Sequence, residues 1–153
     1  MTDIAAAVRD HPFLAQMPVD VRDVLADCAA EAEFPAGAML LREGEPANHF
    51  YLILDGRVSM QLTVPGRPPL VVQTIGPGDV VGLSWLVPMN RSAYDARAQE
   101  RTRTIAVSTP CLYGKCEADA GFGYALLKAF MPPLVRRLQD TRLRLLDVYE
   151  SHA

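Results

Sequence analysis

The middle of the chain alternates between short apolar runs and turn residues. Phe50 to Leu54 is apolar throughout, and Asp55-Gly56 directly after it predicts a tight hairpin. From Val58 to Val64 apolar residues occupy every second position, with Ser, Gln and Thr between them, as in a half-buried strand. Many such strands separated by glycine turns predict an antiparallel β-roll or jelly roll over about residues 34–107. Further strands are predicted at 39–41, 70–75, 96–98 and 102–107.

Two helices are predicted before the first of these strands. Residues 2–10 form a short helix that His11-Pro12 ends, because proline lacks the N–H that a helix interior needs. A second helix begins near Pro18 and runs to Ala30, with one apolar face at helical spacing. That face consists of Val21, Val24, Leu25 and Cys28. Cys28 on this face is interpreted as a small core residue.

The helical period returns after Cys116 and predicts C-terminal helices over about residues 117–149. Pro132 is expected to kink or break this region between Lys128 and Pro133, because its ring clashes with the carbonyl of Lys128. The whole chain, residues 1–153, is predicted to be one α+β domain in which the roll lies between N-terminal helices and a long C-terminal helix.

The long C-terminal helix carries an apolar seam with the spacing of a two-stranded coiled coil. The seam consists of Leu134, Leu138, Thr141, Leu145 and Val148. It predicts a parallel homodimer, and an ordinary amphipathic helix on its own core is the alternative. A second stripe is expected to pack on the chain's own sheet, and it consists of Val135, Leu146 and Tyr149.

Composition excludes several classes of protein. No apolar run approaches the length of a membrane span, and the N-terminus lacks the apolar core of a signal peptide. A cytoplasmic protein that does not associate with a membrane is therefore expected. The net charge of −3 provides no global positive field for nucleic acid. An odd number of cysteines, three, argues against a disulfide framework. The three histidines do not cluster, and Ser84 lacks the glycine-flanked context of a nucleophile, so neither a metal site, a cofactor nor an enzyme is expected.

Residues 75–98 hold the strongest candidate for a binding site. Gly76-Pro77-Gly78-Asp79 is a tight turn, and Leu83 to Leu86 after Gly82 predicts one helical turn. Arg91 follows a few residues later. A glycine turn, outward N–H groups of a short helix and an arginine suit a bound phosphate, and a surface loop with a chance arginine is the alternative.

Four segments in this order resemble the cyclic-nucleotide-binding domain. They read FPAGAMLLREGEPANHFYLILDGRVSM, IGPGDVVG, RSA and RRLQDT. The chain is most similar to the effector domain of bacterial catabolite-activator and fumarate-nitrate-regulator proteins, over roughly residues 11–149. The resemblance implies a β-roll that holds a nucleotide through a phosphate-binding cassette, and a long helix that dimerises.

The resemblance also implies site residues. The backbone N–H groups near Ser84 and Trp85 meet the cyclic phosphate, and Arg91 pairs with it. On the long helix, Thr141 matches the position that reaches the base across the dimer in the family. Arg142 stands where the family commonly has a smaller hydroxyl residue. The implied ligand-binding residues are Gly82, Leu83, Ser84, Trp85, Arg91, Ser92 and Ala93, with Thr141 and Arg142 on the base side.

Two departures from the family pattern bear on ligand binding. The family places Glu directly after the cassette glycine to bind the ribose 2′-OH, and this chain has Leu83. An unpaired ribose hydroxyl costs about 1–3 kcal/mol. Arg91 also lies one residue further from Ala98 than the family's arginine does from the matching alanine. Either a bulge absorbs this residue, or Arg91 turns away and Ser92 takes its place.

Two functions of different classes remain open. The first is a stand-alone regulatory sensor of a ligand of the cyclic AMP or cyclic GMP type that signals through an unknown protein partner. The second is a β-roll with a degenerate site that acts as an interaction module or binds another anionic ligand. The chain reaches Ala153 without a helix-turn-helix after the long helix, so no direct DNA binding is expected.

Overall fold

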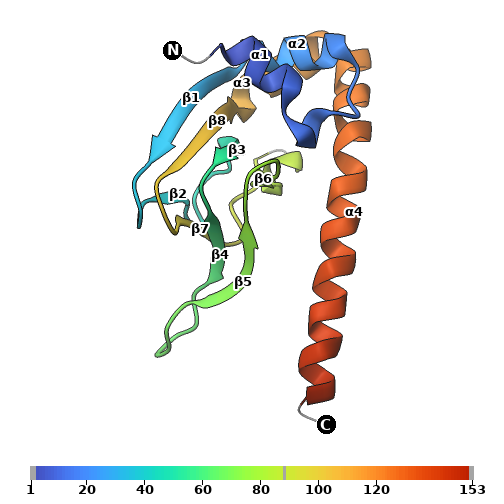
Figure 1. Cartoon of the computed structure of the whole chain (residues 1–153). Coiled ribbons are helices and arrows are strands. Elements are labelled where there is room, and N and C mark those ends of the chain that lie inside the picture. The colour runs from blue at the N-terminus through green and yellow to red at the C-terminus, as the bar shows by residue number, and fades with distance from the viewer. Residues whose placement is uncertain (1–2, 88, 152–153) are drawn as a thin grey trace.

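The computed structural model describes residues 3–87 and 89–151. Two four-stranded antiparallel sheets, in the strand orders β1-β8-β3-β6 and β2-β7-β4-β5, form a β-roll. Short helices cover one end of the roll, and the long helix α4 runs alongside it (Figure 1). The helices are α1 (Ile4–Asp10), η1 (Pro12–Leu14), α2 (Val19–Asp27), η2 (Ser84–Leu86), α3 (Thr109–Ala118) and α4 (Ala120–Ser151). The strands are β1 (Ala29–Phe34), β2 (Met39–Leu41), β3 (His49–Asp55), β4 (Val58–Leu62), β5 (Leu70–Ile75), β6 (Val80–Val81), β7 (Asp95–Ala98) and β8 (Thr102–Ser108). The predicted fold class is confirmed.

β3 separates two apolar cores, which explains its uninterrupted apolar sequence. Phe50 and Leu52 point into a core shared with the helices. Tyr51 and Ile53 point the other way, into the interior of the roll. Successive side chains of a strand face opposite sides, so a strand with a core on each side must be apolar at every position.

The hairpin predicted at Asp55-Gly56 is wrong. β3 pairs with β8 and β6, whereas β4 pairs with β5 and β7, so these two residues form a corner between the sheets. Gly56 has a φ of +103°, and a Cβ on it would lie 2.5 Å from the Thr102 side chain. Only glycine allows both the turn and this close approach. β4 was predicted to be half-buried, with its polar residues exposed. Ser59 is instead buried, and it accepts a hydrogen bond from Gln61 Nε2 at 2.8 Å.

The second helix is shorter than predicted, and the roll is longer. α2 ends at Asp27, and the next residues form β1, which pairs along its whole length with β8. The roll therefore spans residues 29–108. Pairing with a neighbouring strand outweighs the helix propensity of the alanines in β1. The C-terminal helices also begin earlier than residue 117, because the Ser108 hydroxyl accepts from the Cys111 N–H and caps α3.

Cys28 and Cys111 form a disulfide bond, so the expectation of none is wrong. Their Cα atoms lie 5.7 Å apart, although they are 83 residues apart in sequence. Cys28 is also a buried core residue, as predicted. The spacing in sequence offers no signal for this bond, because the β-roll brings the end of α2 to the start of α3.

α4 continues through Pro132 and Pro133, so the predicted break is wrong. Pro132 and Lys128 lie on the exposed side of α4, where water can bind the carbonyl that proline leaves without a donor. Both halves of the helix are anchored. Phe130 is fully buried before the prolines, and Arg137 donates to the carbonyl of Val80 after them. These contacts hold the helical path.

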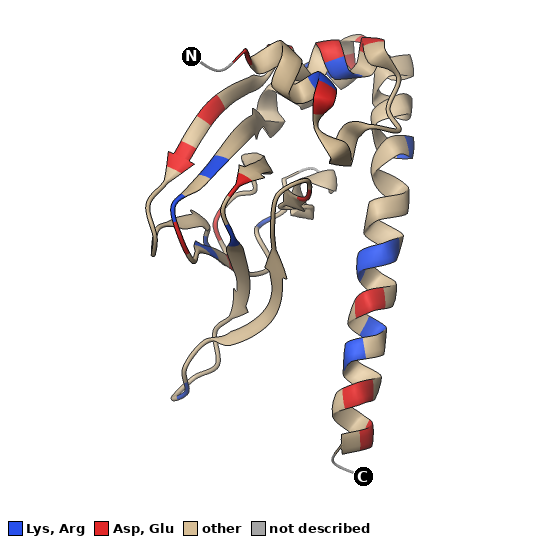
Figure 2. Ribbon diagram, in the orientation of Figure 1, with Lys and Arg blue, Asp and Glu red and all other residues tan. Residues whose placement is uncertain are grey.

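The apolar seam of α4 faces solvent in the single chain. Leu138 is 51% exposed and Leu145 is 69% exposed. The second stripe is exposed as well, so its predicted packing on the sheet is wrong, and the residues that reach the sheet are arginines. Both basic and acidic residues lie along the lower half of α4 (Figure 2). Within residues 3–87 and 89–151, no helix is long and apolar enough to cross a membrane.

Candidate functional site

The segment from Gly82 to Ala93, called the cassette below, joins β6 to β7. Gly82 has a φ of +101°, which turns the chain sharply into η2. A Cβ on Gly82 would lie 3.3 Å from the Leu41 side chain and 3.5 Å from the backbone of β3. No side chain caps η2 among the described residues, so the N–H groups at its start have no side-chain acceptor there.

Two cassette side chains are anchors in the apolar core. Trp85 is 2% exposed and stacks on Phe50, with ring centroids 5.0 Å apart, and it meets Phe130 edge-on at 5.1 Å. Leu83 is 9% exposed and belongs to the same core, not to the interior of the roll. The position that holds Glu in the family is therefore apolar and turned into the helical core.

α3 supports the cassette from behind. The Tyr113 hydroxyl donates to the carbonyl of Trp85. Burial raises the pKa of Tyr113, which keeps the phenol protonated as a donor. Asn90 Nδ2 donates to the carbonyl of Ser84 at 3.1 Å and closes the cassette on itself.

The structure separates Arg91 from Ser92. Arg91 is exposed, and its Nη1 donates to the carbonyl of Gly44 at 2.7 Å. Ser92 is 5% exposed and lines a cavity of about 240 Å³ with Tyr51 and Leu41. Of the two alternatives for the extra residue, this arrangement matches the one in which Arg91 turns away. Ala93, beside them, is exposed.

Tyr94 and Arg137 bring polar atoms to the cassette that the sequence did not single out. The extra residue lies before β7, whose pairing with β4 is regular from Asp95 onward. Burial raises the pKa of Tyr94, and the Arg137 guanidinium and the Gly82 backbone act on it in the opposite direction. Tyr94 Oη and Arg137 Nη1 are buried and make no hydrogen bond of good geometry within the described part of the chain.

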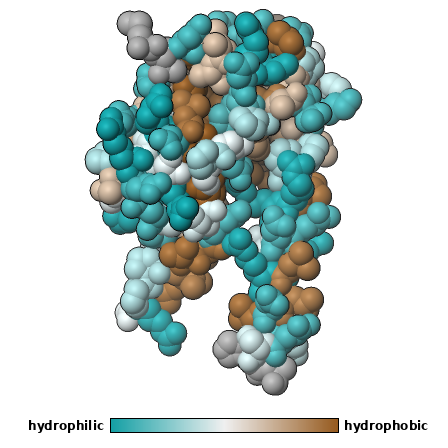
Figure 3. Space-filling view, viewed as in Figure 1, coloured by the Kyte–Doolittle hydropathy of each residue, from teal (hydrophilic) through white to brown (hydrophobic). Residues whose placement is uncertain are grey.

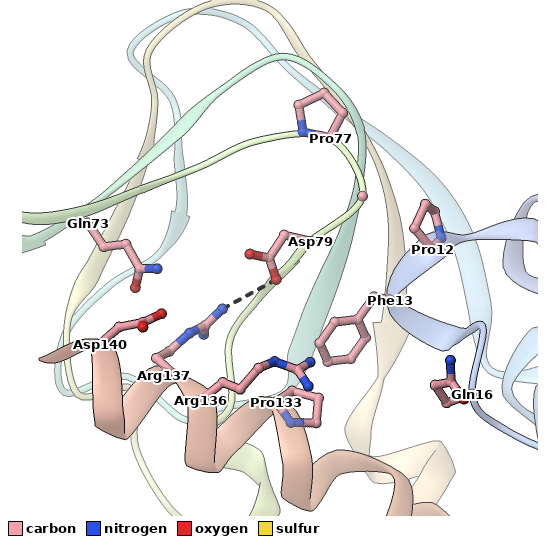
Figure 4. A pocket seen from close by; sticks show the side chains of 11 residues that line it. Pro12, Phe13, Gln16, Gln73, Pro77, Asp79, Pro133, Arg136, Arg137 and Asp140 are labelled. Atoms are coloured by element: carbon pink, nitrogen blue, oxygen red, sulfur yellow. Dashed lines mark ion pairs between the residues drawn. The ribbon is translucent and has the colours of Figure 1, made fainter.

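Arg137 fastens α4 to the strand that precedes the cassette. Its Nη2 donates to the carbonyl of Val80 at 3.0 Å and lies 3.6 Å from Asp79 Oδ1 (Figure 4). Phe130, Arg137 and Arg144 recur every seven residues on the face of α4 that meets the roll, and Arg144 donates to the carbonyl of Val72. Arg137 lies seven residues after the buried Phe130 and therefore on the same face of the helix. This spacing is the sequence signal that would have identified Arg137 as a residue facing the roll.

The predicted base-side residues lie further along α4. Thr141 and Arg142 are exposed, and the Thr141 hydroxyl donates to its own helix, to the carbonyl of Arg137, at 2.8 Å. Among residues 3–87 and 89–151, no hydrogen bond or ion pair joins either residue to the cassette. A partner chain is the route by which they would meet a ligand.

A second hollow lies between η1, the turn before β6 and α4. Its volume is about 560 Å³, and Arg136, Arg137 and Asp140 form its α4 wall opposite Asp79 and Phe13 (Figure 4). Acidic and basic groups balance there. No group of three or more metal-ligating side chains occurs in residues 3–87 and 89–151.

Comparisons with known proteins place this geometry in context. "Cyclic nucleotide-gated ion channel 18" of Arabidopsis thaliana is 28% identical over 95% of this chain and 20% of its own length. The "CRP-like cAMP-activated global transcriptional regulator" of Mycobacterium tuberculosis is 27% identical over 76% of this chain and 50% of its own length. The chain thus spans between a fifth and a half of these relatives.

A solved cyclic nucleotide-binding domain from Methylobacillus flagellatus has the same fold, with a TM-score of 0.77 and 20% identity over 94% of this chain and 81% of that one. The family model for the cyclic nucleotide-binding domain matches residues 31–119, more than half of the chain. That match contains the cassette, α3 and all of the roll except the first two residues of β1. The chain belongs to the cyclic nucleotide-binding domain family.

Proposed function

We propose that the chain is a regulatory module that binds a cyclic nucleoside monophosphate between its cassette and α4 and passes the signal to a protein partner. The observation that carries the proposal is that two buried polar atoms, Tyr94 Oη and Arg137 Nη1, lie near each other and near the backbone of Gly82 without a hydrogen bond of good geometry among the described residues. A buried donor without an acceptor is costly, and a phosphate oxygen is an acceptor that both groups can bind.

The proposed division of labour follows from the side chains. Arg137 supplies the positive charge. The N–H groups at the start of η2 and the Ser92 hydroxyl supply neutral donors. Arg91 keeps its hydrogen bond to the carbonyl of Gly44. These contacts need neither a metal nor a cofactor, and none of the groups is arranged as a nucleophile with its base. The family is regulatory and typically non-enzymatic, which agrees with this role.

Cyclic AMP and its 2′-deoxy analogue are expected to bind with affinities within about threefold of each other, because Leu83 offers no acceptor to the 2′-OH. Cyclic GMP should bind with similar affinity. Isothermal titration calorimetry at millimolar nucleotide measures all three. A deoxy analogue that binds more than about tenfold more weakly, a difference of 1.4 kcal/mol, would show that another residue accepts the ribose hydroxyl.

Replacing Arg137 with glutamine is expected to weaken cyclic AMP binding by about 10- to 100-fold, the range for losing one charged hydrogen bond. Arg136→Gln is the matched control, because Arg136 is the adjacent arginine on α4 and is exposed. Its affinity should stay within about twofold of wild type. Circular dichroism melts of both variants establish that α4 remains docked.

Other outcomes decide between the two functions. If millimolar nucleotide leaves both the calorimetric signal and the melting temperature of wild type unchanged, the sensor function is wrong. The degenerate-site module then stands, and the burial of Leu83 and the turned Arg91 favour it. If Arg91→Ala alone abolishes binding, the phosphate contact belongs to Arg91.

We also propose that α4 pairs with α4 of a second copy. Figure 3 shows apolar surface on the lower part of α4 and on the β4–β5 hairpin, with open space between them. On the hairpin, Leu70 is 56% exposed and Val71 is 52% exposed. Two heptads alone form a marginal coiled coil, so the hairpin's apolar residues would add the remaining contacts.

The double variant Leu138→Glu plus Leu145→Glu is expected to convert a dimer to a monomer in sedimentation velocity, because two carboxylates per helix cannot be buried in an apolar seam. Leu143→Glu is the control. Leu143 is 65% exposed and lies about 200° around the helix from Thr141 and from Leu145, so it should leave the dimer intact. A wild-type monomer at high micromolar concentration contradicts the proposal.

A further inference from the structure

α3 is attached to two separate parts of the molecule within three residues. Cys111 is bonded to Cys28 at the end of α2, and the Tyr113 hydroxyl binds the carbonyl of Trp85 in the cassette. The residue that caps the start of α3 also contacts the end of α2, because the Ser108 N–H donates to the carbonyl of Cys28 at 2.9 Å. The disulfide and the cassette therefore share one short helix.

The two sulfur atoms differ in exposure. Cys28 is 7% exposed, whereas Cys111 is only partly buried, so an external thiolate reaches Cys111 first. Cys116, the free cysteine among the described residues, also lies on α3. Burial raises the pKa of Cys116, with Glu117 adding to the effect, so this thiol is a poor nucleophile for internal exchange.

We propose that the Cys28–Cys111 disulfide is a thiol-exchange site through which a dithiol reductant loosens the cassette. A thiolate of the reductant attacks Cys111 Sγ, the bond between the two cysteines breaks, and Cys28 leaves as a thiolate that takes a proton. The second thiolate of the reductant then attacks the mixed disulfide, closes its own disulfide and releases Cys111, which takes the second proton. Two electrons thus pass from the dithiol to the two cysteines.

The consequence for the cassette follows from the contacts of α3. With the bond closed, α3 cannot move away from α2, and Tyr113 holds the carbonyl of Trp85. With the bond open, α3 keeps its cap and the Ser108 contact but loses its covalent attachment. Segments with fewer constraints open locally at lower free energy, so the cassette becomes more mobile.

Trp85 allows a direct test, because it is the chain's only tryptophan. The oxidised chain is treated with dithiothreitol, and its thiols are counted by alkylation and mass spectrometry. Trp85 emission and its quenching by acrylamide are recorded. The expected result is two new thiols, a red-shifted emission and at least twofold stronger quenching, with an unchanged far-ultraviolet dichroism spectrum. Cys116→Ser should respond as wild type does. In the Tyr113→Phe variant, acrylamide should quench the Trp85 emission strongly even when the disulfide is closed. Reduction should then change that quenching little.

The proposal is overturned by any of three results. Two new thiols with unchanged Trp85 emission would make the bond a staple without influence on the cassette. Three free thiols before reduction, or none gained after it, would mean that no exchangeable bond exists. Loss of the dichroism signal on reduction would mean that the bond holds the whole fold. The effect on nucleotide affinity, a decrease on reduction, rests on the proposed function, whereas the Trp85 readout does not depend on it.

Discussion

Replacing Phe130 with alanine is expected to lower the free energy of unfolding by about 3–5 kcal/mol, the range for a fully buried phenylalanine cut back to alanine. Phe130 is 0% exposed, and its ring centroid lies 5.4 Å from Phe13, 5.5 Å from Phe50 and 5.1 Å from Trp85. It therefore joins η1, β3 and the cassette to α4. Three rings held by three different elements cannot collapse into the space it leaves, so the full cost of a cavity is expected.

Leu143→Ala is the matched control for Phe130→Ala. Leu143 is another large apolar residue of α4 but is 65% exposed, so the expected change is below about 0.5 kcal/mol. Urea denaturation of both variants at one protein concentration measures the difference, since any dimer makes stability depend on concentration. Equal changes for the two variants would show that α4 does not dock through Phe130.

Removing the disulfide by Cys28→Ala plus Cys111→Ala is expected to lower the free energy of unfolding by about 4 kcal/mol. The bond joins residues 83 apart in sequence, and closing so long a loop strongly reduces the entropy of the unfolded chain. At about 2–4 °C per kcal/mol for a chain of this length, the melting temperature should fall by about 8–16 °C. The folded variant should persist, because total stabilities of about 5–15 kcal/mol exceed this loss.

Cys116→Ala controls for the loss of a cysteine without the loss of a cross-link. Cys116 is partly buried and free, so its replacement should change the melting temperature by no more than about 4 °C. Calorimetry of oxidised wild type, reduced wild type and both variants gives the comparison. Reduced wild type should match the double variant. If the double variant melts within about 2 °C of oxidised wild type, the cross-link is not formed in solution.

Local patterns predicted most of the roll. Short strands show as apolar runs, and the glycines with positive φ mark the turns. Patterns of this kind do not say which strands pair. Asp55-Gly56 has the composition of a hairpin turn, but Gly56 lies against the backbone of Arg101 and Thr102, and the chain passes there into the other sheet. β1 was missed for a related reason, since alanine and glutamate become a strand only because β8 offers them a partner.

The candidate site was predicted in part. The resemblance located the cassette, and in the structure Gly82 forms the turn into η2, Ser84 begins η2 and Ser92 lines a cavity of about 240 Å³. It could not show that Leu83 turns into the helical core or that Arg91 binds Gly44, because both depend on how one extra residue is accommodated. Tyr94 and Arg137 meet only after α4 docks on the roll.

Periodicity and local backbone requirements were enough to predict the roll, its flanking helices and the apolar seam of α4, and the resemblance of four segments indicated the family. Three features could be seen only in the folded chain: the Cys28–Cys111 bond, the continuity of α4 through Pro132 and the contact of Arg137 with Val80. The bond and the Arg137 contact join segments far apart in the chain, and the continuity of α4 depends on contacts of this kind on both sides of the prolines. Their energy comes from contacts that exist only once the two cores have formed, so no local pattern records them.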